Sequence, residues 1–462
     1  MIVASEIFGR DSSGSVAFKN AALTFCDDED PHWKVKASRI WLLPGGEFAF
    51  LNAVVYVGKI PVLYLPAFFI YHDFSFSFIE GWEHPFDLIQ AAGGLVNKYA
   101  VGTAVMESPF FLGAHLLSLL RDALTGSHTA TGYTNLYQYA ILFGGVFYWM
   151  AGTTFLYKLL IKYGHFSEKV SLITCFFITY GTNLFHYASY DACFSHIYSY
   201  TLFILFLYYL CWYESPDRQG KNTLFHTCIF GFLAGLIFMV RNTNILFVLT
   251  YVFYGVYNPG TLKQRFLTIL KPGRALPIII TGFVTLLPQL AYWHTATGHW
   301  FIYSYGSNEP FYWLSPQLIN WLFSVRKGLF FWSPILLIAL IGIVCAYRKH
   351  HELYTGFVIF LIVIAYVSSA WWSWWYGGSF GQRVAVDFLC VFALFMAYAF
   401  ALAETKINAG SKTTGIVIYR ILLYGYCILC TVWNLICMLG YWYRIIPSDG
   451  ATWQDILNLL PH

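Results

Sequence analysis

The sequence predicts an all-α polytopic membrane protein with about ten transmembrane helices, an interfacial helix in the first outer loop and a small β-rich N-terminal segment. Hydrophobic residues make up 58% of the 462 residues and charged residues only 11%, whereas a soluble protein of this size carries roughly 25% charged residues. Segments such as 193–213, 329–347 and 384–403 approach the ~20 apolar residues that cross a bilayer. Backbone groups in hydrocarbon must satisfy one another, so long unbroken apolar segments are helices.

The loops between the apolar segments alternate in charge, and this alternation predicts a topology. Fourteen Lys and Arg residues lie in the loops 158–169, 214–224, 258–275, 347–353 and 404–420. Five lie in the segments 124–136, 186–193, 241–244, 294–328, 371–383 and 441–462. The positive-inside rule makes the first set cytoplasmic and the second outward-facing. The net charge of +4 is therefore a topology signal, and no nucleic-acid partner is expected.

Residues 1–66 differ from the rest and are expected to form a β-rich segment. Short β-rich runs occupy 17–26, 32–43 and 47–65, separated by an acidic turn and by Pro44-Gly45-Gly46. Three strands alone bury too little apolar surface to be stable, so this segment needs a partner surface.

The sequence from residue 25 to residue 66 resembles part of a known periplasmic domain. It contains Cys26-Asp27, Pro31-His32-Trp33, the Lys36–Ile40 strand and a Pro-Val-Leu-Tyr-Leu-Pro end at residue 66. Together these resemble the β-jellyroll of the lipopolysaccharide-assembly outer-membrane protein. The resemblance covers about fifty residues and implies a partial jellyroll.

From Tyr64 onward the chain resembles a different family. The stretches 64–78, 95–117, 195–206, 322–337 and 371–389, taken in order, resemble bacterial integral-membrane proteins similar to the type C glycosyltransferases. That group contains protein mannosyltransferases and lipid A aminoarabinose transferases. The resemblance covers residues 64–443 and implies transfer of a sugar from a lipid-phosphate donor, with a re-entrant first outer loop.

The two resemblances meet at Tyr64-Leu65-Pro66, so the chain reads as a chimera, either natural or an artefact. The expected parts are the β-rich segment 1–66, an outward-facing loop 67–136 with interfacial helices, the helix bundle 137–443 and an outward-facing tail 444–462. Type C enzymes begin with a helix that delivers a catalytic acid to the outer face. The matching stretch here, 52–63, contains no Asp or Glu, which leaves open that the chain is inactive.

Charged groups at the edge of a membrane are costly and are usually kept for pairing or function. Transfer from a polyprenyl phosphate needs a cation for the departing phosphate, and the planar fork of Arg binds two phosphate oxygens at once. Arg383, which ends a Gly-rich stretch, is the first candidate, and Arg326 the second. Other candidate substrate-binding residues on the outward side are Lys98, His196, Arg241, Trp374 and Trp375. His196 is also explained by an interhelical hydrogen bond, and the Trp run by interfacial anchoring.

The reaction also needs a carboxylate that accepts the proton of the acceptor hydroxyl. Asp73 and Asp191 are the candidates for this catalytic base. Asp191 is equally explained as the N-cap of the helix beginning near Cys193. No cofactor is expected, and the spacing of His72, Asp73 and His84 fits no specific metal pattern.

These features favour a glycosyltransferase of the bacterial inner membrane, acting on its periplasmic face. The expected partners are a polyprenyl-phosphate sugar donor, a lipid or envelope-glycan acceptor and membrane lipids. A lipid or glycan transporter or flippase is one alternative, although such proteins usually show internal repeats and polar residues at the membrane midplane. A lipopolysaccharide-assembly factor that binds through the β-rich segment is the other.

Overall fold

The computed structural model describes most of the chain. The described residues are 2–4, 7–10, 16–24, 33–42, 48–51, 54–57, 64–73, 88–91, 93–215, 223–305, 309–405 and 413–459.

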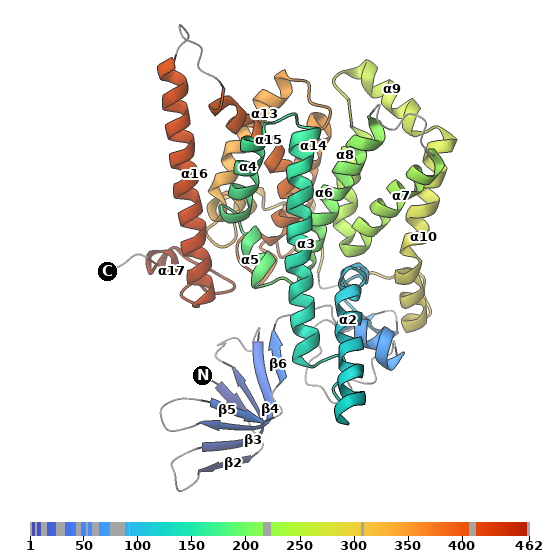
Figure 1. Ribbon diagram of the computed structural model, residues 1–462, viewed down its shortest axis with the longest axis vertical. Helices are drawn as coiled ribbons and strands as arrows, with labels where there is room; N and C mark the ends of the chain where they lie inside the picture. Colours follow the sequence, from blue (N-terminus) through green and yellow to red (C-terminus); the bar gives the residue numbers. More distant parts are fainter. Residues whose placement is uncertain are drawn as a thin grey trace.

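The N-terminal segment forms a six-stranded antiparallel sheet that lies beside the helices and not among them (Figure 1). Its strands are β1 (Ile2–Ala4), β2 (Ile7–Arg10), β3 (Val16–Thr24), β4 (Trp33–Leu42), β5 (Phe48–Leu51) and β6 (Val54–Val57). The long strands β3 and β4 pair at the centre. Strands β1 and β2 share the free edge of β3, and β5 and β6 share that of β4. Strands β3 to β6 lie in the three β-rich runs of the sequence apart from the first residue of β3, whereas β1 and β2 precede these runs and were not predicted. The similarity of the sheet to a jellyroll stays a prediction.

A short connection leads from the sheet into the helical body. It contains α1 (Tyr64–Pro66), the π-helix η2 (Ala67–Tyr71) and a hairpin of β7 (Leu88–Ala91) and β8 (Gly94–Asn97). Helix α2 (Gly102–Thr125) follows and packs against α3 (Asn135–Lys162). Tyr64 and Phe111 anchor this region in a small apolar core that also contains Tyr292.

The remaining helices form one bundle (Figure 1). They are α4 (Glu168–Tyr180), α5 (Leu184–Ser189), α6 (Ser195–Glu214), α7 (Thr223–Val240), η5 (Asn242–Val248), α8 (Leu249–Val252), α9 (Pro259–Ile269), α10 (Pro272–Thr297), α11 (Leu318–Phe323), α12 (Leu329–Trp332), η6 (Pro334–Leu337), α13 (Ile338–Arg348), α14 (Tyr354–Ala370), η7 (Arg383–Phe388), α15 (Leu389–Ala403), α16 (Thr413–Trp442) and α17 (Trp453–Leu457).

Helices α6 and α15 lie at the centre of the bundle, where most of their residues are buried. Both are apolar on all sides, as expected for helices without a solvent-facing side. Close packing there depends on small residues. A side chain at Gly342 of α13 would collide with the backbone of Phe395 on α15, so only glycine allows these helices to approach so closely. Helices α3, α10 and α16 instead carry exposed large apolar side chains along their length, as expected for helices that face lipid.

Six helical segments in the described part of the chain are long and apolar enough to cross a membrane. They are Gly102–Thr125, Asn135–Lys162, Thr223–Val240, Pro272–Thr297, Arg383–Ala403 and Thr414–Trp442. The chain is thus a mostly helical, multi-pass membrane protein, but the expected count of ten spans is not confirmed. Helix α2, expected to be interfacial, is among the six, so its length and composition do not separate the two placements.

Candidate functional site

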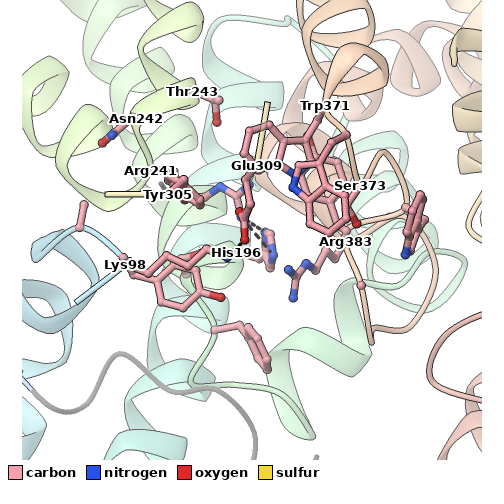
Figure 2. A pocket seen from close by; sticks show the side chains of 18 of the residues that line it. Lys98, His196, Arg241, Asn242, Thr243, Tyr305, Glu309, Trp371, Ser373 and Arg383 are labelled. Carbon is pink, nitrogen blue, oxygen red and sulfur yellow. Dashed lines mark hydrogen bonds and ion pairs between the residues drawn. The ribbon is translucent and has the colours of Figure 1, made fainter. Parts of the chain in front are cut away.

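A cavity of about 520 Å³ lies where several helix ends and loops meet. Its walls come from the starts of α2 and α6, the end of α7, the loop after α10, the loop 371–378, η7 and the C-terminal tail (Figure 2). Each of these segments that follows α3 lies within, or directly next to, a segment that the charge pattern predicts to face outward. The lining residues used below are Lys98, Phe194, His196, Arg241, Tyr305, Glu309, Phe311, Trp371, Trp375, Tyr376, Arg383 and Asp449.

Three cations line the cavity, and they differ in how they are paired. Lys98 forms an ion pair with Glu309 and lies over the ring of Tyr305, 5.2 Å from its centre. Arg241 lies 3.4 Å from the carboxylate of Asp387. For Arg383, no acidic partner is found in the described part of the chain. Its guanidinium lies 5.7 Å from the ring centre of Phe194, and its buried Nε has no hydrogen-bond partner there.

Arg383 therefore offers an uncompensated positive charge to the cavity. It begins η7, directly after Gln382, whose buried amide donates to the carbonyl groups of Trp374 and Lys327. These two bonds fix the backbone that carries Arg383. A guanidinium with unused donors, held by a fixed backbone, is suited to an anionic group such as phosphate.

His196 and Asp387 form a buried hydrogen-bonded pair at the cavity wall. His196 is the second residue of α6, Asp387 lies in η7, and the distance from Nδ1 to Oδ1 is 2.7 Å. Both side chains are 1% exposed. The sequence predicted His196 as a substrate-binding residue or as an interhelical hydrogen-bonding residue. In the structure it lines the cavity and also forms a hydrogen bond between α6 and η7.

Aromatic rings form one wall of the cavity. Phe311 pairs with Trp371 through an isolated β-bridge and a ring contact of 4.7 Å, which joins the loop after α10 to the loop after α14. Tyr305 contacts the edge of Trp371 at 5.5 Å. Burial raises the pKa of the Tyr305 and Tyr376 phenols. They are therefore neutral at ordinary pH and keep an O–H group for hydrogen bonding.

A buried lysine, Lys327, is hydrogen-bonded to the Gly-rich loop before Arg383. Tyr376, Gly377 and Gly381 have φ values of 58°, 67° and 59°. Such values favour glycine, which occupies two of the three positions. The ammonium group of Lys327 donates to the carbonyl oxygen of Ser379 within this loop and to that of Ser448 in the tail. Burial lowers the pKa of Lys327 to about 7, with smaller lowering from Arg383 and Arg326 and an opposing effect of Asp449.

Arg326, the second phosphate candidate, does not line the cavity. Its Nε and Nη2 donate to Asp449 Oδ1 at 3.0 and 2.9 Å, and its guanidinium lies 3.6 Å from the ring centre of Trp375. The indole of Trp375 also donates to Asp449 Oδ2, at 3.1 Å. Arg326 thus braces Trp375, which lines the cavity, whereas Trp374 is buried outside it.

Neither predicted catalytic base lines the cavity. Asp191 Oδ2 lies 2.8 Å from His186 Nε2, and the indole of Trp442 donates to His186 Nδ1 at 2.8 Å. The alternative role of Asp191 as a helix N-cap is wrong, because α6 begins after Phe194 and has no side-chain cap. Asp73 lies at the end of η2, where its amide donates to the Ala67 carbonyl.

Three acidic residues near the cavity had no predicted role. They are Glu309, Asp387 and Asp449. Their importance comes from partners far along the chain, respectively Lys98, His196 and Arg326, so no local spacing reveals it. Among the described residues, no group of three His, Cys, Asp or Glu side chains could hold a metal ion. The third member of the metal pattern considered above, His84, lies outside the described residues.

No family model matches this sequence. No curated protein matches it either. Among solved structures, the chain is similar to an oligosaccharyltransferase of Archaeoglobus fulgidus tethered to an acceptor peptide, with 10% identity, a TM-score of 0.48 and coverage of 86% of this chain and 52% of that one. It is also similar to archaeal oligosaccharyltransferase AglB of the same organism, in complex with an inhibitory peptide and a dolichol-phosphate, with 12% identity, a TM-score of 0.46 and coverage of 82% and 52%. The chain thus spans about half the length of these proteins. Similarity at this level leaves the activity to be argued from the residues themselves.

Proposed function

We propose that the chain is a membrane glycosyltransferase that moves a sugar from a polyprenyl-phosphate donor to a lipid or envelope-glycan acceptor. The observation that carries this proposal is the guanidinium of Arg383, which has no acidic partner among the described residues and lines a cavity at the helix ends that the charge pattern predicts to face outward. A phosphate ester buried beside such a group gains charge-assisted hydrogen bonds, and these strengthen as the leaving phosphate acquires its second charge.

The other walls of the cavity suit the sugar. Trp371 and Phe311 line it with apolar aromatic rings, while Tyr305 and Tyr376 carry O–H groups. A sugar ring has both apolar faces and hydroxyl edges, so a pocket lined by aromatic and hydroxyl groups matches it on both counts. The ion pair of Lys98 and Glu309 closes the wall beside Tyr305.

The lipid tail of the donor would remain in the bilayer while its phosphate reaches the cavity. Exposed apolar helices surround the bundle, and the charge pattern of the loops favours the periplasmic face of a bacterial inner membrane for the open side. The acceptor would then be a lipid or glycan of the envelope.

A transfer assay with membranes from a Gram-negative host tests the proposal. Membranes containing the chain are incubated with a panel of radiolabelled polyprenyl-phosphate monosaccharides, and label in the lipid and lipopolysaccharide fractions is counted. We expect transfer above the level of empty membranes, and we expect Arg383→Ala to reduce it roughly a hundredfold. The matched control is Arg348→Ala, because Arg348 is an exposed residue at the end of α13, in a predicted cytoplasmic loop. Absence of transfer from every donor would refute the proposal.

A further inference from the structure

The buried pair of His196 and Asp387 has the geometry of a proton-accepting group. Asp387 Oδ1 lies 2.7 Å from His196 Nδ1. An ionised carboxylate can only accept a hydrogen bond, so the shared proton belongs to Nδ1. Nε2 of the neutral ring then keeps its lone pair, and His196 belongs to the wall of the cavity.

Arg241 keeps this arrangement in place without occupying the lone pair of Nε2. Its Nε lies 3.4 Å from Asp387 Oδ2, which stabilises the carboxylate in its ionised form. One terminal nitrogen, Nη1, lies 3.4 Å from His196 Nδ1 and 3.3 Å from Nε2. A position in the ring plane at these nearly equal distances would collide with Cε1, so the guanidinium nitrogen lies over the face of the ring and is not aligned with the in-plane lone pair of Nε2.

We propose that His196 is the general base of the transfer reaction and that Asp387 is its positioning residue. This rests on the proposed function. His196 Nε2 takes the proton of the acceptor hydroxyl as its oxygen bonds to the anomeric carbon of the sugar. The bond between that carbon and the phosphate oxygen breaks, and its electron pair leaves with the polyprenyl phosphate, beside Arg383. The products are the glycoside, polyprenyl phosphate and protonated His196, which returns its proton to water.

The carboxylates of the cavity are less suited to this role than His196. Glu309 is paired with Lys98, and Asp449 accepts from Arg326 and Trp375. A carboxylate held by a cation loses proton affinity, so neither gains a proton readily in the transition state. His196 also lies beside cations, Arg241 and Arg383, but the carboxylate of Asp387 opposes their effect and orients the ring so that Nε2 is the accepting nitrogen, as in the base of acyl-transfer triads.

The test uses the full-length chain in lipid nanodiscs, with the donor found active in the membrane assay and lipopolysaccharide extracted from the host as the acceptor. Gln at position 196 can still donate to Asp387 but is not a base, so His196→Gln separates proton transfer from packing. We expect kcat to fall ~100-fold or more with KM changed less than threefold. We also expect loss of the acidic limb of the pH profile of kcat/KM, and partial recovery of His196→Ala by added imidazole. The charged groups near His196 that could shift the pH of this limb are Asp387, Arg241 and Arg383. The titratable ring of Tyr187 in α5 also faces His196, with 5.4 Å between the two ring centres.

The possible outcomes separate the two proposals. If the wild type transfers sugar and His196→Gln stays within threefold of its kcat, with the acidic limb retained, His196 is not the base and the proposed function stands. If His196→Gln is inactive but imidazole restores nothing in His196→Ala and Asp387→Asn leaves the pH profile unchanged, the pair is structural and the inference is wrong. If the wild type transfers from no donor, both proposals fall together.

Discussion

Replacing Arg383 with alanine tests phosphate binding in the cavity, because we expect it to change the transfer rate strongly and the stability of the fold only slightly. Its guanidinium has no acidic partner in the described part of the chain, so its removal strands no buried carboxylate. The lost contact with Phe194, at 5.7 Å, is worth about 1 kcal/mol or less. Removing one preorganised donor from a developing oxyanion instead costs about 3 kcal/mol of transition-state stabilisation, or roughly a hundredfold in rate.

The assay follows initial transfer rates in nanodiscs alongside the thermal unfolding midpoint. We expect Arg383→Ala to lose roughly a hundredfold in kcat/KM while its midpoint stays close to that of the wild type. Arg383→Lys keeps the charge but loses the planar fork, so its rate should lie between the two. Arg348→Ala changes an exposed residue in a predicted cytoplasmic loop and should match the wild type in both measurements. A rate for Arg383→Ala within threefold of the wild type, at an unchanged midpoint, would refute phosphate binding by this residue.

Three further changes test the charges around the cavity. Arg241→Ala leaves Asp387 buried without a counter-charge, so we expect a loss of stability of about 3 kcal/mol. Adding Asp387→Asn to this variant should restore most of that stability. Losses that simply add in the double variant would contradict the ion pair. The folded pKa of Lys327, about 7, lies below its ordinary value of about 10.4, so the folded chain binds fewer protons than the unfolded chain between these values. The wild type should therefore gain stability relative to Lys327→Met as pH rises from 7 to 10, and a difference in unfolding midpoint that is independent of pH would exclude the lowered pKa. Asp191→Asn weakens one hydrogen bond to His186 and should cost about 1 kcal/mol of stability with little change in kcat; a hundredfold loss of kcat at full stability would make Asp191 the base.

Much of the cavity wall could be predicted from charge patterning alone. Lys98, His196, Arg241, Trp375 and Arg383 come from four segments far apart in the chain, and all five residues line one cavity. This agrees with the expectation that residues at the same end of a helix bundle meet near its axis, because loop charge sets the side on which each helix end lies. The role of these residues in substrate binding stays a prediction. The pattern of loop charges does not indicate which residues at the helix ends contact one another.

The residues that were placed differently show this limit. Arg326 and Arg383 are similar in sequence context, since each lies at a predicted outward helix end with glycine close by in sequence. One is held by Asp449 and stacks on Trp375, while the other has no acidic partner in the described residues. The difference comes from a carboxylate more than a hundred residues away in the tail. Only the folded chain decides which Arg is available to a phosphate.

The resemblance to type C enzymes implies a catalytic acid that the stretch 52–63 lacks. The ion pairs and hydrogen bonds of the other carboxylates indicate which group could accept the proton instead. Of the described outward carboxylates, Asp191, Glu309 and Asp449 each contact a His, Lys or Arg side chain, and none has a base beside it that faces the cavity. Asp387 alone is joined to a cavity-lining side chain that can itself accept a proton. If the chain transfers sugar without the leading acid of that family, the proton has its clearest route to His196, and the charge left on the ring is balanced by Asp387 at 2.7 Å.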